Sequence, residues 1–493
     1  MADEGMTGYE RLGEKRLTLV DVIAQSVGFI GPVFSAAFLI PLIAGYNASG
    51  KGAGVATPFA VILAAIGVFA LGWVVAQFAR RIHAAGSLYD YVSDGLGART
   101  GAVAGWVYYG ATTVLASAIA VLIGGLIHDI IFLEFNKEPL PYWAWNLIYV
   151  GAVFLIMWLG VQISTRVQLT LALTSAVVVL IFFIYVITKA PSQDLSAFTP
   201  GSADQGWSGI LFGVLYGVLI FVGFETAANL AEETAEPKRQ IPRAVLYSVL
   251  IVSAFYLVAA YAQVAGFGFD MATFTSKDVN VAGPIFVLAA PSSLSPYSYG
   301  GTWIERLIEL VVLLDIAAVG LGAAVASTRG IFALARDRRI PAPLAKVSTK
   351  RGTPIGAIAL VSGFSLAVVL WEWWGPGIKA LDGYFPMFAW LSTFGGFTLL
   401  VVYALMAVGS FTGLSDHPKQ VSVLIAGIVG LAISLAGLFG GIYKQTYPFS
   451  LVWVVCAGWI VIGIIVTSIV KGREPASQVL GDLHAADVDD RRP

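Results

Sequence analysis

Apolar runs long enough to cross a lipid bilayer follow one another along almost the whole of this chain. A spanning helix needs about 20 apolar residues, and runs bounded by charge, Pro or Gly predict twelve spans. Their expected ranges are 18–46, 55–80, 101–130, 142–162, 166–189, 208–233, 242–267, 303–334, 354–374, 383–411, 420–442 and 449–470. Only 12% of the 493 residues are charged and the mean hydropathy is +0.81, so too few charged side chains remain to coat a soluble globule. The sequence therefore predicts an all-α polytopic membrane protein in a lipid bilayer.

The basic residues are distributed unevenly between the two sides of these spans. Seven of the 29 basic residues fall on one side, namely Lys51, Lys137, Lys189, Lys277, Arg306, Lys379 and Lys444. The others fall on the side of the termini, and basic residues accumulate in cytoplasmic loops. We therefore expect a multi-pass protein of the plasma membrane with both termini cytoplasmic and with polar tails at 1–17 and 472–493. No cleavable signal peptide is expected, because residues 1–16 lack an apolar core.

Several classes of function lack support in this composition. The net charge is −1 and the basic residues are scattered, so no nucleic-acid partner is expected. The single cysteine, Cys456, cannot form an intrachain disulfide, and none of the four histidines has a neighbour at metal-ligand spacing. No Gly-rich phosphate loop followed by Lys-Ser or Lys-Thr is present. We expect no metal, no cofactor and no ATP-driven step.

The first and sixth spans carry helix-breaking residues at their centres. Gly31 and Pro32 lie within the first span, and a proline there removes an N–H donor and clashes with the preceding turn. In the sixth span Gly223 lies just before Glu225. The two spans hold matching positions in two groups of five, 18–190 and 191–411, which an odd number of spans makes opposite in topology. Paired breaks in inverted repeats mark the binding site of secondary transporters, although Gly and Pro are also common in other membrane helices.

Four further stretches carry recognisable motifs at fixed places relative to the spans. They are residues 79–106, 224–244, 327–341 and 352–354. By these motifs the chain resembles the amino acid–polyamine–organocation family of permeases over residues 18–411. The resemblance implies a core of ten helices built as five plus five inverted repeats, with spans 11 and 12 (412–471) outside it. The family's first span usually has a second glycine where this chain has Val33, which leaves open whether the substrate's head group is an ordinary α-carboxylate.

A helix broken inside the membrane exposes unpaired N–H groups at the start of one half and unpaired C=O groups at the end of the other. A zwitterion matches both, since its carboxylate suits the positive end of a half-helix and its ammonium suits the free carbonyls. The expected carboxylate donors are the amides of Gly31, Val33 and Phe34. The predicted substrate-binding residues are Ile30, Gly31, Pro32, Val33 and Phe34 of span 1, Phe221, Val222, Gly223, Phe224 and Glu225 of span 6, and Tyr109 of span 3.

Two acidic residues, Glu225 and Asp315, lie inside apolar spans, where an ionised side chain usually has a partner or a task. For Glu225 three roles stay open: a hinge that binds loose backbone amides, a contact for an ammonium group, and a proton site. Asp315 lies nine residues inward of Arg306, about 13 Å at 1.5 Å per residue, and therefore near the middle of a core roughly 30 Å thick. Asp315 is expected either to bind a coupling cation (H⁺ or Na⁺) or to be a structural carboxylate.

Together these features predict a secondary active transporter rather than an enzyme. It would move an amino acid, with a neutral or apolar side chain favoured, by alternating access and with cation coupling. A permease for polyamines or other organic amines and an amino acid exchanger remain alternatives. A channel is disfavoured because paired breaks suit an occluded site. An intramembrane enzyme is disfavoured because no nucleophile–base pair is recognisable.

Overall fold

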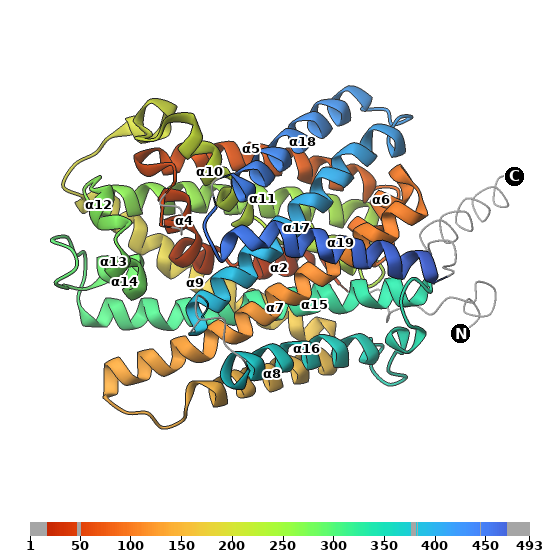
Figure 1. Ribbon diagram of the computed structural model, residues 1–493, viewed down its shortest axis with the longest axis horizontal. Coiled ribbons are helices and arrows are strands. Elements are labelled where there is room, and N and C mark those ends of the chain that lie inside the picture. The colour runs from red at the N-terminus through yellow and green to blue at the C-terminus, as the bar shows by residue number, and fades with distance from the viewer. Residues whose placement is uncertain (1–16, 47–50, 376–380, 382, 444, 471–493) are drawn as a thin grey trace, which may run out of the picture.

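The molecule is a bundle of long helices (Figure 1). The structure is a computed structural model that describes residues 17–46, 51–375, 381, 383–443 and 445–470. Within these ranges no strand forms beyond two isolated bridges. The all-α fold predicted from the apolar runs is therefore confirmed.

The first span consists of several short helices. They are α2 (Leu19–Ile30), α3 (Pro32–Phe34), a π-helix (Ser35–Leu39) and α4 (Ile40–Ala44). Thr18 caps α2 by a capping box with Asp21, which supplies partners for amides that the first turn leaves unpaired. We refer to residues 32–44 as the second half-helix of span 1.

The remaining helices are mostly continuous. In chain order they are α5 (Thr57–Phe78), α6 (Leu88–Leu96), α7 (Ala98–Phe135), α8 (Tyr142–Leu159), α9 (Val161–Lys189), α10 (Gly206–Leu219), α11 (Pro237–Gly266), α12 (Met271–Phe274), α13 (Lys277–Ala282), α14 (Pro284–Ala289), α15 (Thr302–Arg336), α16 (Ile355–Trp374), α17 (Tyr384–Gly413), α18 (Gln420–Ile442) and α19 (Val452–Ile469). Short 3₁₀ helices, including Thr226–Leu230 after α10, lie in the connections.

Eleven spans in the described part of the chain are long and apolar enough to cross a membrane, and α10 is a shorter apolar helix in the place of the sixth. The twelve predicted segments therefore all correspond to apolar helices. The sixth differs from the helix predicted at 208–233, because its α-helix ends at Leu219 and the chain continues through tight turns.

The helices differ in how deeply they are buried. In the most apolar stretch of each span, 89% of the residues of span 1 and 78% of those of α15 and α17 are buried, against 17% for α8 and α19. Span 1 therefore lies at the centre and the last helix at the periphery. Figure 1 shows α8 and α16 along one edge of the bundle and α18 beside α5 along the opposite edge.

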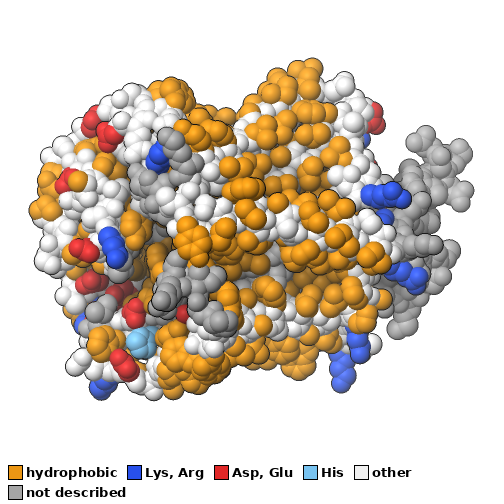
Figure 2. Space-filling model, in the orientation of Figure 1, with side chains coloured by type: hydrophobic (Ala, Val, Ile, Leu, Met, Phe, Trp, Pro, Cys, Tyr) orange, Lys and Arg blue, Asp and Glu red, His pale blue; other side chains and the backbone are white. Residues whose placement is uncertain are grey.

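The surface matches a protein that spans a bilayer. Figure 2 shows hydrophobic side chains across the middle of this face, with charged side chains confined to its two ends. The exposed large hydrophobic residues include Ile181 of α9, Ile425 of α18 and Ile465 of α19. Apolar side chains exposed in such numbers are stable when lipid rather than water surrounds them.

Candidate functional site

Span 1 breaks at Gly31, where the chain turns through a φ of +59°. The Gly31 amide donates to the Val27 carbonyl at 3.0 Å and ends α2. A left-handed φ suits glycine because it has no Cβ. Pro32 then begins the second half-helix, where a first-turn residue needs no N–H donor. The hydroxyl of Ser35 donates to the Ile30 carbonyl at 3.1 Å and so bridges the break.

Span 6 breaks over residues 220–225, and Gly223 has a φ of +115° there. The Tyr256 hydroxyl of α11 donates to the Ile220 carbonyl at 2.6 Å. Beyond the turn, the Thr226 hydroxyl donates to the Gly223 carbonyl at 2.7 Å. The Tyr256 bond gives a partner to a carbonyl at the end of the interrupted helix, and the Thr226 hydroxyl adds to the bond that its own amide makes to Gly223 at 3.0 Å. The chain continues as a 3₁₀ helix instead of the predicted α-helix.

The two breaks are in direct contact. A Cβ added to Gly223 would lie 3.0 Å from the Ile30 nitrogen, so only a glycine allows this approach. The Ser26 hydroxyl of α2 donates to the Phe224 carbonyl at 2.9 Å and accepts from the Ala227 amide at 3.1 Å. One serine of the first span therefore joins a carbonyl inside the break of the sixth span to an amide just after it.

A small, mostly apolar cavity lies beside the breaks. It is lined by Phe29, Ile30, Phe34, Ser35, Leu39, Leu115, Ile119, Leu219, Val222, Val319 and Ser392. Its volume is about 30 Å³, whereas a single water needs roughly 10 to 15 Å³. The helices must therefore separate before the cavity can hold an organic solute.

Asp315 of α15 lies at the start of the second half-helix of span 1. Its Oδ2 accepts a hydrogen bond from the Phe34 amide at 2.7 Å, and the side chain is completely buried. A Cβ on Gly31 would lie 3.3 Å from the same oxygen. A carboxylate at this position is favourable because the free N–H groups and the dipole of a helix start are positive. The second oxygen, Oδ1, is buried and has no hydrogen-bond partner among the described residues.

Glu225 lies at the turn of span 6, with both carboxylate oxygens hydrogen-bonded. Oε1 accepts from the Tyr108 hydroxyl of α7 at 2.8 Å, and Oε2 accepts from the Gly223 amide at 3.3 Å. The side chain is completely buried. Glu225 thus holds a loose amide of the break, which is the geometry of the hinge role considered from the sequence.

The predicted site residues divide into three groups. The side chains of Ile30, Phe34 and Val222 line the cavity. The others in the two breaks are buried beside it without lining it, namely Gly31, Pro32, Val33, Phe221, Gly223, Phe224 and Glu225. The third group is Tyr109 alone, which the structure does not bring to the cavity. Its hydroxyl donates to the Gly86 carbonyl at 2.5 Å and its ring packs against Gly330, because this face of α7 turns toward the 79–97 hairpin.

Sequence reasoning missed several residues that line the cavity. Val319 lines the cavity and lies one helical turn after Asp315, so it shares the same face of α15. The four-residue spacing from Asp315 could therefore have predicted it from the sequence. Leu115 and Ile119 of α7 and Ser392 of α17 also line it. They are embedded in apolar helices that show almost no difference between faces, so nothing in the sequence marks them.

Aromatic side chains cover the cavity on the side of the second half-helix. The rings of Phe34 and Phe388 meet edge to face with centroids 5.7 Å apart, and those of Phe38 and Phe385 lie 6.2 Å apart. Spans 1 and 10 are therefore held together there by apolar contacts, which can separate without leaving a charge unpaired.

Buried ion pairs close the opposite side. Arg336 of α15 contacts both carboxylate oxygens of Glu232, at 2.8 and 3.0 Å. The Ala85 amide of the 79–97 hairpin donates to the same glutamate at 3.0 Å. Arg329 lies 3.4 Å from Glu233. These contacts tie α15, the segment after span 6 and the hairpin together.

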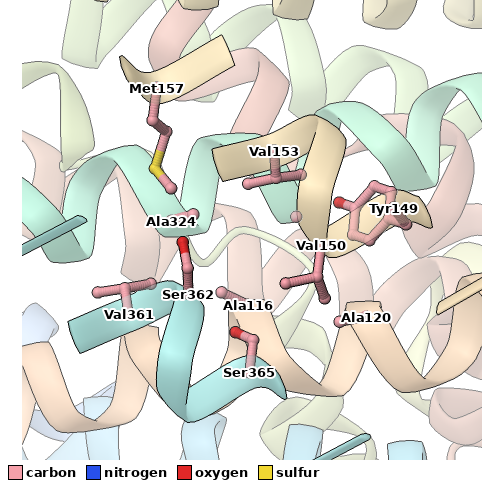
Figure 3. A pocket seen from close by; sticks show the side chains of 11 residues that line it. Ala116, Ala120, Tyr149, Val150, Val153, Met157, Ala324, Val361, Ser362 and Ser365 are labelled. Carbon is pink, nitrogen blue, oxygen red and sulfur yellow. The ribbon is translucent and has the colours of Figure 1, made fainter. Parts of the chain in front are cut away.

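A second cavity, between α7, α8, α15 and α16, is smaller still (Figure 3). Its polar lining groups include Tyr149, Ser362 and Ser365. Its volume of about 10 Å³ is about that of one water site at most. Among the described residues, no three His, Cys, Asp or Glu side chains are grouped to hold a metal ion. The contact of the two breaks is therefore the best-supported functional site.

The sequence profile of the amino acid permease family matches residues 27–443, which include both breaks, Glu225 and Asp315. The chain belongs to the amino acid permease family. This permease is accordingly a multi-pass membrane transporter for small molecules and not an enzyme. The resemblance recognised from the sequence motifs is confirmed.

The permease is similar to several curated proteins at low identity. It is 25% identical to the branched-chain amino acid permease BcaP of Bacillus subtilis (strain 168) over 64% of this chain and 66% of that protein. It is 25% identical to an uncharacterized transporter of Mycobacterium tuberculosis (strain ATCC 25618 / H37Rv) over 85% of each chain. It is 24% identical to the gamma-aminobutyric acid permease of Bacillus subtilis over 66% of this chain and 65% of that protein.

Proposed function

We propose that this permease is a secondary active transporter that moves an amino acid with a neutral, apolar side chain, or an amine of the same shape, across the plasma membrane. The observation that carries the proposal is the contact between the breaks of spans 1 and 6 beside a shared cavity. Backbone breaks near the middle of a membrane bind the polar head group of a solute in this architecture. The apolar cavity wall suits the rest of the solute.

The cavity wall argues against a charged side chain on the substrate. Among the described residues, the polar side chains that line it are Ser35 and Ser392 alone, and burying an unpaired charge among apolar groups is costly. The relatives named for branched-chain amino acids and for gamma-aminobutyric acid carry small solutes, which is compatible with a cavity of this kind.

The proposed mechanism is alternating access. The aromatic contacts of Phe34 and Phe38 separate when the site opens on one side, and the ion pairs of Arg336 and Arg329 separate when it opens on the other. Leu17, the first described residue, donates to the Glu233 carbonyl at 3.0 Å on the ion-paired side, and we propose that this side and both termini are cytoplasmic. Coupling to H⁺ or Na⁺ would use a buried carboxylate, Asp315 or Glu225.

Uptake by the purified chain in proteoliposomes tests this function. Labelled leucine, valine and phenylalanine and the amines of the same shape are supplied with an inward H⁺ gradient, an inward Na⁺ gradient, or neither. We expect saturable uptake that exceeds equilibrium under one gradient and that an ionophore abolishes. If uptake needs no ion gradient but does need solute loaded inside the liposomes, the permease is instead an exchanger. Non-saturable flux, or no flux above that of protein-free liposomes, would contradict the proposal.

A further inference from the structure

Two of the three amides expected to bind a substrate carboxylate already have partners within the protein. The Gly31 amide donates to the Val27 carbonyl at 3.0 Å. The Phe34 amide donates to Asp315 at 2.7 Å. An N–H group has a single hydrogen to donate. A substrate carboxylate would therefore meet the Asp315 carboxylate at the start of the second half-helix, where two of the three expected donors are taken.

The carbonyls at the breaks, unlike those two amides, can still take part in further hydrogen bonds. Ile30 accepts from Ser35, Ile220 accepts from Tyr256, and each carbonyl oxygen has a second lone pair. The site thus keeps its capacity to accept hydrogen bonds after two of its three expected donors are occupied. This asymmetry suits an ammonium group, which only donates.

The charged groups around the breaks also favour an ammonium group. Asp315 and Glu225 are both completely buried beside the cavity without lining it. Among the residues that the structure describes, no Lys, Arg or His lines the cavity. Both oxygens of Glu225 have partners, whereas Oδ1 of Asp315 has none among the described residues. A buried carboxylate that lacks a cation is strongly unfavourable. A second carboxylate brought beside it by an amino acid would add repulsion.

We propose that Asp315 takes the place of a substrate carboxylate and that this permease therefore selects a protonated primary monoamine with an apolar body over the amino acid with the same side chain. The ammonium binds Oδ1 of Asp315 and the carbonyls at the breaks, and the apolar body fills the cavity beside Val222 and Val319. This inference rests on the proposed transport function. It leaves Glu225 as the site for a coupling cation.

Matched pairs of solutes test the inference directly. The full chain in proteoliposomes is given leucine against 3-methylbutylamine and phenylalanine against 2-phenylethylamine, each pair differing only by the carboxylate. We expect the amine to have the lower half-saturation concentration in each pair, by about 10-fold or more, as for a hydrogen bond between charged partners. Equal values, or a lower value for the amino acids, would overturn the inference while leaving the proposed transport function intact. Failure of all four solutes to enter would contradict both.

The variant Asp315→Asn assigns the preference to this residue. Asparagine keeps an oxygen for the Phe34 amide and removes the charge, so we expect the preference for the amines to fall by about 10-fold or more. Glu309→Gln is the matched control, because it removes a buried carboxylate from the same helix six residues farther than Asp315 from Val319, which lines the cavity, and it should keep the preference. An unchanged preference in Asp315→Asn would overturn the assignment. Elution in size-exclusion chromatography and thermal unfolding show whether that variant folds. If it does not, the comparison of the solute pairs in the unaltered chain still tests the preference for amines.

Discussion

At Gly31 two structural constraints coincide. Its φ of +59° is unfavourable for residues with a Cβ, and a Cβ there would lie 1.9 Å from Cγ2 of Val319. Gly223 is similar, with a φ of +115° and the backbone of Ile30 at 3.0 Å from its Cβ position. These two glycines allow the two breaks and α15 to approach one another, and so they form the site without contributing a side chain.

Replacing Gly31 with alanine should therefore disrupt both binding and packing. We expect Gly31→Ala to lower the stability of the permease by roughly 1 to 3 kcal/mol through backbone strain and overpacking, and to abolish saturable uptake. Thermal unfolding and proteoliposome uptake measure the two effects. Gly363→Ala is the control, because a Cβ at Gly363 of α16 meets nothing within 4 Å. Uptake at the unaltered level in Gly31→Ala would refute the role assigned to the break.

The Tyr108–Glu225 hydrogen bond gives a second prediction at this scale. Tyr108→Phe leaves a buried carboxylate oxygen without its donor at 2.8 Å, and an unsatisfied buried group costs about 1 to 3 kcal/mol. We expect a lower unfolding temperature. Glu225→Gln in the same chain should recover part of the loss, because a neutral amide tolerates the missing donor better than a carboxylate. Additive losses in the double-mutant cycle would indicate that the two side chains do not act together.

At the scale of elements, α15 connects the candidate site to the ion-paired side of the bundle. It carries Asp315 beside the break in span 1, and Arg329 and Arg336 in the buried pairs at its far end. All three side chains are buried on one continuous helix of 35 residues. A shift of this helix therefore changes the contacts of the site and of the ion pairs at once.

The Arg336–Glu232 pair should keep this side of the permease closed. Arg336→Gln leaves Glu232 buried with fewer partners, and breaking a buried pair costs about 3 to 5 kcal/mol. We expect faster amide hydrogen exchange in the 79–97 hairpin, whose Ala85 amide donates to Glu232, together with slower net uptake. Arg338→Gln is the control on an exposed arginine two residues away. Unchanged exchange in the hairpin would argue that the pair does not govern opening on this side.

At the scale of the whole molecule, two exposed loops can report the orientation of the permease in the membrane. Ser293 lies between α14 and α15 and Lys350 lies between α15 and α16, and both are exposed. In a background with Cys456→Ala, which removes the single cysteine, a membrane-impermeant thiol reagent added outside intact cells should label Ser293→Cys and not Lys350→Cys. The opposite pattern would place the termini outside the cell.

The sequence predicted the helices and the position of the two breaks, because membrane-length apolar runs and Gly31–Pro32 act locally on the backbone. It did not predict the 3₁₀ continuation after Gly223, which depends on bonds from Ser26 about 200 positions away. A place for Asp315 well inside its span was predicted by counting residues along the helix, but its partner Phe34 is 281 positions distant. Tyr109 was expected at the site because it is aromatic, although the face it occupies depends on how α7 packs. Contacts between distant spans therefore needed the structure.

Substrate protection of a cysteine placed in the cavity tests whether the two breaks share one site that opens to each side in turn. Ser392→Cys, in the Cys456→Ala background, puts one thiol of nearly unchanged size on the cavity wall, and Ser434→Cys of α18 is a buried control away from it. A membrane-impermeant thiol reagent is applied from either side of the membrane, with and without a transported solute. Our account predicts labelling of Ser392→Cys from both sides, protection by the solute, and no labelling of Ser434→Cys. Labelling from only one side, or labelling that no transported solute reduces, would contradict a shared site with alternating access.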